Sequence, residues 1–130
     1  YPAFGSGSVG DVIEALATVF DEGITDITLH APDPSPGFLA EIGLGPDGVN
    51  PELQPDVFSW FSGIPNYEPP STVPPQDDMY GVWVIPSAAG TFDLAARFSP
   101  DNGTNWIYCD LDGSGNGYQL SKAGHVLVQP

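Results

Sequence analysis

Apolar and polar residues alternate along much of the chain, most clearly in the segment TFDLAARF, residues 91–98. Phe92, Leu94, Ala96 and Phe98 fall on one side of an extended chain, and the residues between them fall on the other. A period of two is typical of a strand with one face in a core. The segment is therefore predicted to be a half-buried strand.

Short runs of β-branched and aromatic residues recur between turn-forming residues elsewhere in the chain. The sequence contains 16 glycines and 15 prolines, a punctuation typical of an all-β sandwich. Five prolines in segment 65–78 exclude it from a central strand and indicate an exposed connection. Further strands are predicted at residues 38–44, 56–63, 79–85, 105–111 and 125–129.

The N-terminal segment SVGDVIEALATVF, residues 8–20, has two interpretations. Ser8 and Asp11 match a capping box, and apolar residues follow at helical spacing, which favours a helix slightly. The same residues also fit a strand that is apolar on both faces, and such a strand needs cover on both sides.

The charge of the chain restricts its partners. Seventeen acidic residues against two basic ones give a formal net charge of −15 at pH 7. Such a surface repels nucleic acids and anionic membranes, and it attracts cations such as calcium. No apolar run approaches the roughly 18 residues that a membrane helix requires. We expect a secreted protein at the cell surface or outside the cell, with no membrane insertion and with its signal peptide removed.

A chain of 130 residues is long enough for one domain. We expect residues 1–11 to form an N-terminal tail and residues 12–130 to form the sandwich. Cys109 is the single cysteine, so an internal disulfide is excluded. Burial of this thiol is favoured over pairing between chains.

Three segments together resemble a known module: FLAEIGLGPDGVNP (38–51), AGTFDLAARFS (89–99) and FSPDNGTNWIYCDLDGSGNGY (98–118). They are similar to a recurrent Ig-like β-sandwich module of large secreted bacterial proteins, found in myxobacteria-like lineages. The resemblance implies an antiparallel sandwich of about seven strands with long loops. It also implies that residues 13–26 form the first strand and turn, and that the domain is an accessory or surface module.

The segment SPDNGTNW, residues 99–106, fits S-x-D-x-G-x-x-W, the Asp-box of sialidase propellers. Ser99 opens the motif, Asp101 can accept hydrogen bonds from backbone amides across the turn, Gly103 suits a positive φ, and Trp106 can fold back over the hairpin. Propellers repeat the motif in each blade, whereas it occurs once here. It therefore predicts a structural hairpin and not sialidase activity.

The loop CDLDGSGNGY, residues 109–118, resembles the start of an EF-hand. Asp110, Asp112, Ser114 and Asn116 occupy ligand positions, but Ser121 stands where a bidentate Glu belongs. Two interpretations remain: a looser calcium site, or a plain turn in which Asp and Asn bond their own backbone.

No motif in the sequence indicates a catalytic site. His30 and His125 lack metal-ligand spacing, no G-x-S-x-G occurs, and Cys109 lies in a predicted strand. We expect a non-catalytic module in structural or adhesive association with proteins, including self-assembly into a fibre or surface layer assisted by calcium. The alternative is a carbohydrate-binding module of a secreted hydrolase, with a polysaccharide as ligand. Its candidate stacking residues are Trp60, Tyr67, Trp83 and Trp106.

Overall fold

The protein is a β-sandwich of nine strands joined mainly by loops. The computed structural model describes residues 4–20, 22–23, 36–66, 77–110 and 118–130. In these ranges the helices are single 3-10 turns, η1 (Pro55–Val57) and η2 (Leu120–Lys122). The strands are β1 (Phe4–Ser8), β2 (Ile13–Val19), β3 (Leu39–Pro46), β4 (Ser59–Ser62), β5 (Ile64–Pro65), β6 (Asp78–Val84), β7 (Gly90–Ser99), β8 (Ile107–Cys109) and β9 (Gly124–Gln129).

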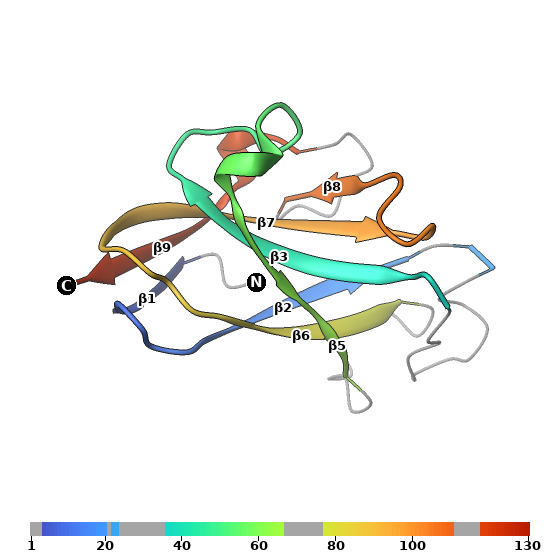
Figure 1. Ribbon diagram of the computed structural model, residues 1–130, viewed down its shortest axis with the longest axis horizontal. Helices are drawn as coiled ribbons and strands as arrows, with labels where there is room; N and C mark the ends of the chain where they lie inside the picture. The colour runs from blue at the N-terminus through green and yellow to red at the C-terminus, as the bar shows by residue number, and fades with distance from the viewer. Residues whose placement is uncertain (1–3, 21, 24–35, 67–76, 111–117) are drawn as a thin grey trace.

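Two sheets form the layers of the sandwich (Figure 1). The larger sheet has the strand order β1-β9-β7-β3-β4, with β8 also paired to β7, and the smaller sheet has the order β2-β6-β5. All pairs are antiparallel except β1 with β9. The predicted all-β sandwich is confirmed, with nine strands instead of about seven.

The main core fills the space between the two sheets. Leu94 and Phe98 of β7 lie in this core, with Phe92 and Ala96 packed against it, as the alternation of residues 91–98 predicted. The inward-facing residues of the other core strands follow the same period of two. They are Ala15 and Ala17 of β2, Ala40, Ile42 and Leu44 of β3, Tyr80, Val82 and Val84 of β6, and Val126 and Val128 of β9.

One stretch of chain supplies an edge strand to both sheets. β4 pairs with β3 in the larger sheet, and β5 pairs with β6 in the smaller one, so the chain crosses between layers at Gly63 (Figure 1). The Gly63 amide donates a hydrogen bond to the Ala40 carbonyl at 2.7 Å. A Cβ at this position would lie 3.1 Å from that oxygen and 3.2 Å from Cβ of Tyr80. Glycine therefore allows the close crossing.

Within segment 8–20, Ile13–Val19 form strand β2 and Ser8 ends β1. The strand implied by the resemblance is confirmed, and the slight preference of the pattern for a helix was wrong. Asp11 accepts a hydrogen bond from the Ser8 amide at 2.8 Å, as the acid of a capping box does. Here the bond closes a turn, in which Gly10 has a φ of +86°. The chain then enters β2, because that strand buries its inner residues against the larger sheet.

The expected N-terminal tail contains a strand. Residues 4–8 form β1 and pair in parallel with β9 along five register positions, from Phe4 opposite His125 to Ser8 opposite Gln129. Val9 extends the contact by donating from its amide to the Gln129 carbonyl at 3.0 Å. Residues 4–9 are thus part of the larger sheet.

Two other predicted strands are shorter than expected. Segment 56–63 begins with η1 and becomes strand at Ser59, and segment 105–111 is reduced to β8. Most of the proline-rich connection, residues 67–76, lies outside the described residues. No helix in the described part of the chain is long and apolar enough to cross a membrane.

Candidate functional site

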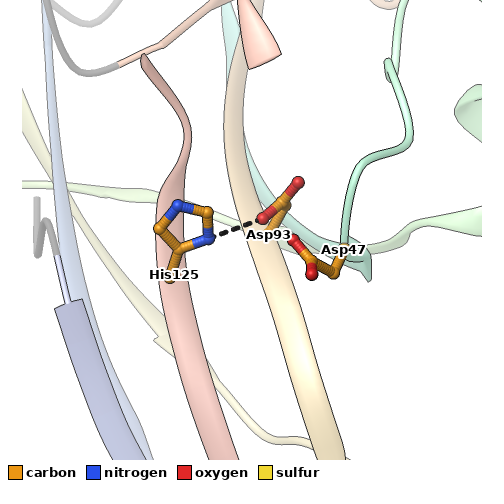
Figure 2. Close-up of side chains that lie close together, drawn as sticks. All are labelled: Asp47, Asp93 and His125. Atoms are coloured by element: carbon orange, nitrogen blue, oxygen red, sulfur yellow. Dashed lines mark ion pairs between the residues drawn. The ribbon is translucent and has the colours of Figure 1, made fainter. Parts of the chain in front are cut away.

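Asp47, Asp93 and His125 converge at one end of the larger sheet, and one ligand atom from each lies within 4.8 Å of the others (Figure 2). The sheet register explains this meeting. Asp93 of β7 is the direct cross-strand neighbour of His125 in β9. On its other side Asp93 pairs with Gly45 of β3, and Asp47 follows two residues later. Three segments that are distant in sequence therefore deliver three metal-ligating side chains to one point.

Asp93 is the buried member of this cluster. Its side chain is 2% exposed, against 44% for His125, and the Gly48 amide donates a hydrogen bond to its Oδ2 at 2.8 Å. Its Oδ1 lies 2.8 Å from Nδ1 of His125, a close ion pair, yet this oxygen accepts no hydrogen bond of good geometry in the described structure. A buried carboxylate oxygen without such a bond is costly unless a cation compensates it.

No ion pair in the described ranges joins this carboxylate to Arg97 or Lys122. Arg97 makes an ion pair with Glu41 at 2.8 Å, and the other ion pair within the described ranges is that of His125 with Asp93. Lys122 lies exposed in η2. Asp47 is exposed and adds a second negative charge beside Asp93. The cluster thus carries two carboxylates for one imidazole.

The outer face of the larger sheet is covered by a second, aromatic cluster. Phe58 stacks on Trp60 at 5.5 Å between ring centroids, and both rings lie over β3 where it carries glycine. The Trp60 indole donates a hydrogen bond to the Pro55 carbonyl at 3.0 Å. Tyr118 and Ala123 are buried in the same cluster.

Arg97 closes this aromatic cluster on one side. Its guanidinium lies 3.9 Å from the ring centre of Trp60 and 4.0 Å from that of Trp106. Trp60, expected as a sugar-stacking residue, is therefore packed between Phe58 and Arg97. Its ring faces are occupied by the protein itself.

The outer face of the smaller sheet exposes several large apolar side chains. Trp83 of β6 is 51% exposed, Ile64 of β5 is 52% exposed, and Ile85, which follows β6, is 46% exposed. Leu16 and Ile64 flank Gly81, which is their cross-strand neighbour on both sides. We call this set the apolar outer face; its members are Val12, Leu16, Ile64, Gly81, Trp83 and Ile85.

The hairpin 99–106 has the hydrogen bonds that its residue types suggest. Asp101 accepts from the Asn105 amide at 2.8 Å and from the Asn105 side chain at 2.7 Å, bonds that lower the pKa of Asp101 below its usual value. Ser99 Oγ accepts from the Gly103 amide at 2.8 Å. Gly103 has a φ of +87°, and Trp106 lies over it.

The expected calcium loop lies mostly outside the described residues. Asp112, Ser114 and Asn116 fall in the range 111–117, and Tyr67, a candidate for sugar stacking, also falls outside. Asp110 is described, and its carboxylate accepts a hydrogen bond from the Gln119 amide at 2.8 Å. The thiol of Cys109 is free and partly buried.

The spacing of histidines along the chain gives no sign of the cluster of Asp47, Asp93 and His125, because its members are far apart in sequence. His125 is a ligand candidate only through the pairing of β9 with β7. Comparison with protein-family models, with curated proteins and with solved structures found no match to this chain.

Proposed function

We propose that this chain is a non-catalytic structural module that associates with copies of itself through the apolar outer face. The observation that carries the proposal is the exposure of Trp83, Ile64 and Ile85 together on one side of a three-stranded sheet. A contiguous apolar surface of this kind is typical of an interaction site. In β2, Ala15 and Ala17 lie in the core, and the outer side carries Leu16 between Glu14 and Thr18.

Charge selects this face for contact between copies. Two chains that each carry −15 repel wherever their acidic surfaces meet. On the apolar outer face, Glu14 is the charged residue within β2, opposite Trp83 in the register. Where two such faces approach, the apolar side chains of both copies leave water, and this hydrophobic gain can exceed the repulsion between the two Glu14 side chains.

Shape also favours a self-complementary contact. Gly81 leaves a shallow gap, since a Cβ built there would meet only Leu16 within 4 Å, at 3.9 Å. Trp83 stands two residues away on the same side of β6. In a two-fold dimer the Trp83 ring of each copy can fill the Gly81 gap of the other. A two-fold contact closes on itself, so a fibre or surface layer would require an additional contact.

Sedimentation velocity over a range of protein concentrations and salt tests the proposal. We expect a monomer–dimer equilibrium that shifts toward dimer in about 1 M salt, where the Debye length falls to about 3 Å and repulsion is screened. Trp83→Thr should abolish the dimer, and Ile64→Thr should weaken it. Ile107→Thr is the matched control, because Ile107 is a strand isoleucine of similar exposure, 58%, on the other sheet.

A chain that stays monomeric at high concentration in both low and high salt would refute self-association. Dimers that persist in Trp83→Thr would place the contact elsewhere. Binding of the monomer to a glycan array, lost in Trp83→Thr, would instead favour the carbohydrate-binding alternative, since Trp83 is exposed enough to stack on a sugar. The extracellular location expected from the sequence stays a prediction.

A further inference from the structure

We infer that Asp47, Asp93 and His125 form a binding site for a divalent transition-metal ion of the zinc class. The inference does not depend on self-association, because the cluster lies on the larger sheet and the apolar outer face on the smaller one. It rests on two observations: the convergence of three ligand atoms within 4.8 Å, and the buried Oδ1 of Asp93 that accepts no hydrogen bond of good geometry.

The ligand set selects the class of metal. Imidazole nitrogen suits Zn²⁺, Co²⁺, Ni²⁺ and Cu²⁺, whereas Ca²⁺ and Mg²⁺ prefer sites made only of oxygen. Two carboxylates and a neutral imidazole carry a charge of −2, which a divalent ion balances. Nδ1 of His125 faces Asp93, so this nitrogen and Oδ1 are the natural first pair of ligands (Figure 2).

The site needs little rearrangement to close around an ion. Bonds of about 2.0–2.2 Å to a tetrahedral Zn²⁺ bring ligand atoms to about 3.4 Å from one another. The Asp93–His125 pair, at 2.8 Å, must open slightly, and the exposed Asp47 side chain can rotate inward. The Gly48 amide holds Oδ2 of Asp93 and so fixes the carboxylate, as outer hydrogen bonds do in metal sites.

Three protein ligands leave a coordination position open. His125 is 44% exposed, so solvent reaches the cluster from its side. Water can complete a tetrahedral shell there. The site is therefore expected to hold an exchangeable ion and not one that is required for folding.

Titration of the metal-free protein with Zn²⁺ by calorimetry, and with Co²⁺ by visible absorption, tests the site. We expect one ion per chain, intense tetrahedral Co²⁺ bands without a thiolate charge-transfer band, and no displacement by equimolar Ca²⁺ or Mg²⁺. Asp47→Asn and His125→Gln should each weaken binding at least about tenfold, since loss of even an outer-shell partner of a metal ligand costs about that much. Circular dichroism should show that both variants fold.

Two controls separate this site from other metal-binding groups. Asp56→Asn makes the same charge change at an exposed acid outside the cluster, and Cys109→Ser removes the thiol; both should bind Zn²⁺ as the unaltered chain does. Asp47→Asn keeps the Asp93–His125 pair intact, so a loss of binding there reports a lost ligand and not a lost fold. Absence of saturable Zn²⁺ and Co²⁺ binding, or binding unchanged in both cluster variants, would overturn the inference.

Discussion

The two outer faces of the sandwich differ in how far other residues of the chain cover them. The outer face of the larger sheet is covered by Phe58, Trp60 and Tyr118, which belong to or follow the long connections of that layer. On the apolar outer face of the smaller sheet, none of the described aromatic contacts involves Trp83, and half of that residue is exposed. Both faces carry aromatic residues, so hydrophobicity alone does not distinguish them.

Glycines make the difference concrete. On the larger sheet, Cβ atoms at Gly43 and Gly45 would lie 2.6 Å from the Trp60 ring and 2.4 Å from the Phe58 ring. On the smaller sheet, the nearest described atom to a Cβ at Gly81 would be in the Leu16 side chain, at 3.9 Å. A glycine within a strand thus marks a filled contact on one face and an open one on the other. In the dimer that we propose, the Trp83 ring of a second copy would fill the gap at Gly81.

The largest expected effect on stability comes from adding a methyl group at a strand glycine that faces an aromatic ring. Gly45→Ala should lower the free energy of unfolding by about 1–3 kcal/mol, because Phe58 is buried and cannot move aside without strain. Gly81→Ala should be neutral or slightly stabilising in the monomer, since Gly costs about 0.5–1 kcal/mol relative to Ala in a strand. Urea denaturation of the two variants measures the difference. Equal destabilisation by both would show that the faces are not distinct.

A smaller effect is expected at the edge of the covered face, where Arg97 lies between two indole rings and pairs with Glu41. Arg97→Lys should cost about 1–2 kcal/mol, because an ammonium cannot stack flat on both rings while bonding the carboxylate. Lys122→Arg, the reverse exchange at an exposed site, should change stability little. Thermal denaturation of both variants is the measurement, and an unaltered midpoint for Arg97→Lys would mean that the stack contributes nothing.

The third prediction tests whether calcium stabilises the fold through the segment that joins Asp110 to Tyr118. The loop that begins at Asp110 leads to Tyr118, whose amide donates a hydrogen bond to Glu52 at 2.6 Å. If the loop binds calcium, a tenfold excess over Kd should stabilise the fold by about 1.4 kcal/mol. Asp112→Ala should remove the rise in thermal midpoint, and magnesium at equal ionic strength should not reproduce it. The same midpoint in calcium and in chelator would leave the loop as a plain turn.

The last effect appears only in alkaline solution. Burial, with smaller contributions from Asp110 and Glu52, raises the pKa of the Cys109 thiol from 9.0 to about 11. Thiolate at pH 8 should therefore be about a hundredfold scarcer in the folded chain than in urea, and reaction with a disulfide reagent should be slower in proportion.

The same shift sets the sign of a pH effect on stability. The folded state favours the protonated thiol, so this contribution is present below pH 9 and is lost as the pH rises toward about 11. Burial also raises the pKa of Tyr118, which adds to the loss at high pH. Cys109→Ser should reduce the alkaline decline in thermal midpoint without abolishing it. Fast thiol reaction at pH 8 would show that the region around β8 opens readily.

The layer architecture could be predicted from sequence, because the period of two in residues 91–98 reports directly which side of β7 faces the core. The packing of other residues over the opposite side of β7 could not be predicted. Asp93 and Ala95 alternate with core residues as exposed positions would, yet they are 1% and 3% exposed. Ala95 packs in the cluster of Phe58 and Tyr118, and Asp93 accepts a hydrogen bond from the Gly48 amide. These partners lie far away in sequence, and alternation carries no information on such contacts.

The cluster of Asp47, Asp93 and His125 could not be predicted from the sequence for a related reason. Asp47 belongs to a turn, Asp93 to β7 and His125 to β9, and only the register of β3, β7 and β9 brings them together. The turn 99–106 was predictable, because its hydrogen bonds join residues at most four positions apart. Local chemistry could therefore be inferred from the residues, whereas sites assembled across strands required the structure.

The parallel pairing of β1 with β9 has a mechanical consequence. In a parallel pair the leading end of β1 and the trailing end of β9 lie at opposite ends of the contact, with Phe4 beside His125 and Ser8 beside Gln129. A tension that draws the first residues of β1 and the last residues of β9 apart would slide the strands along each other. All five paired positions would then resist together and would not unzip in turn. The pairing of β1 with β9 would therefore resist unfolding when the chain is stretched from its two ends.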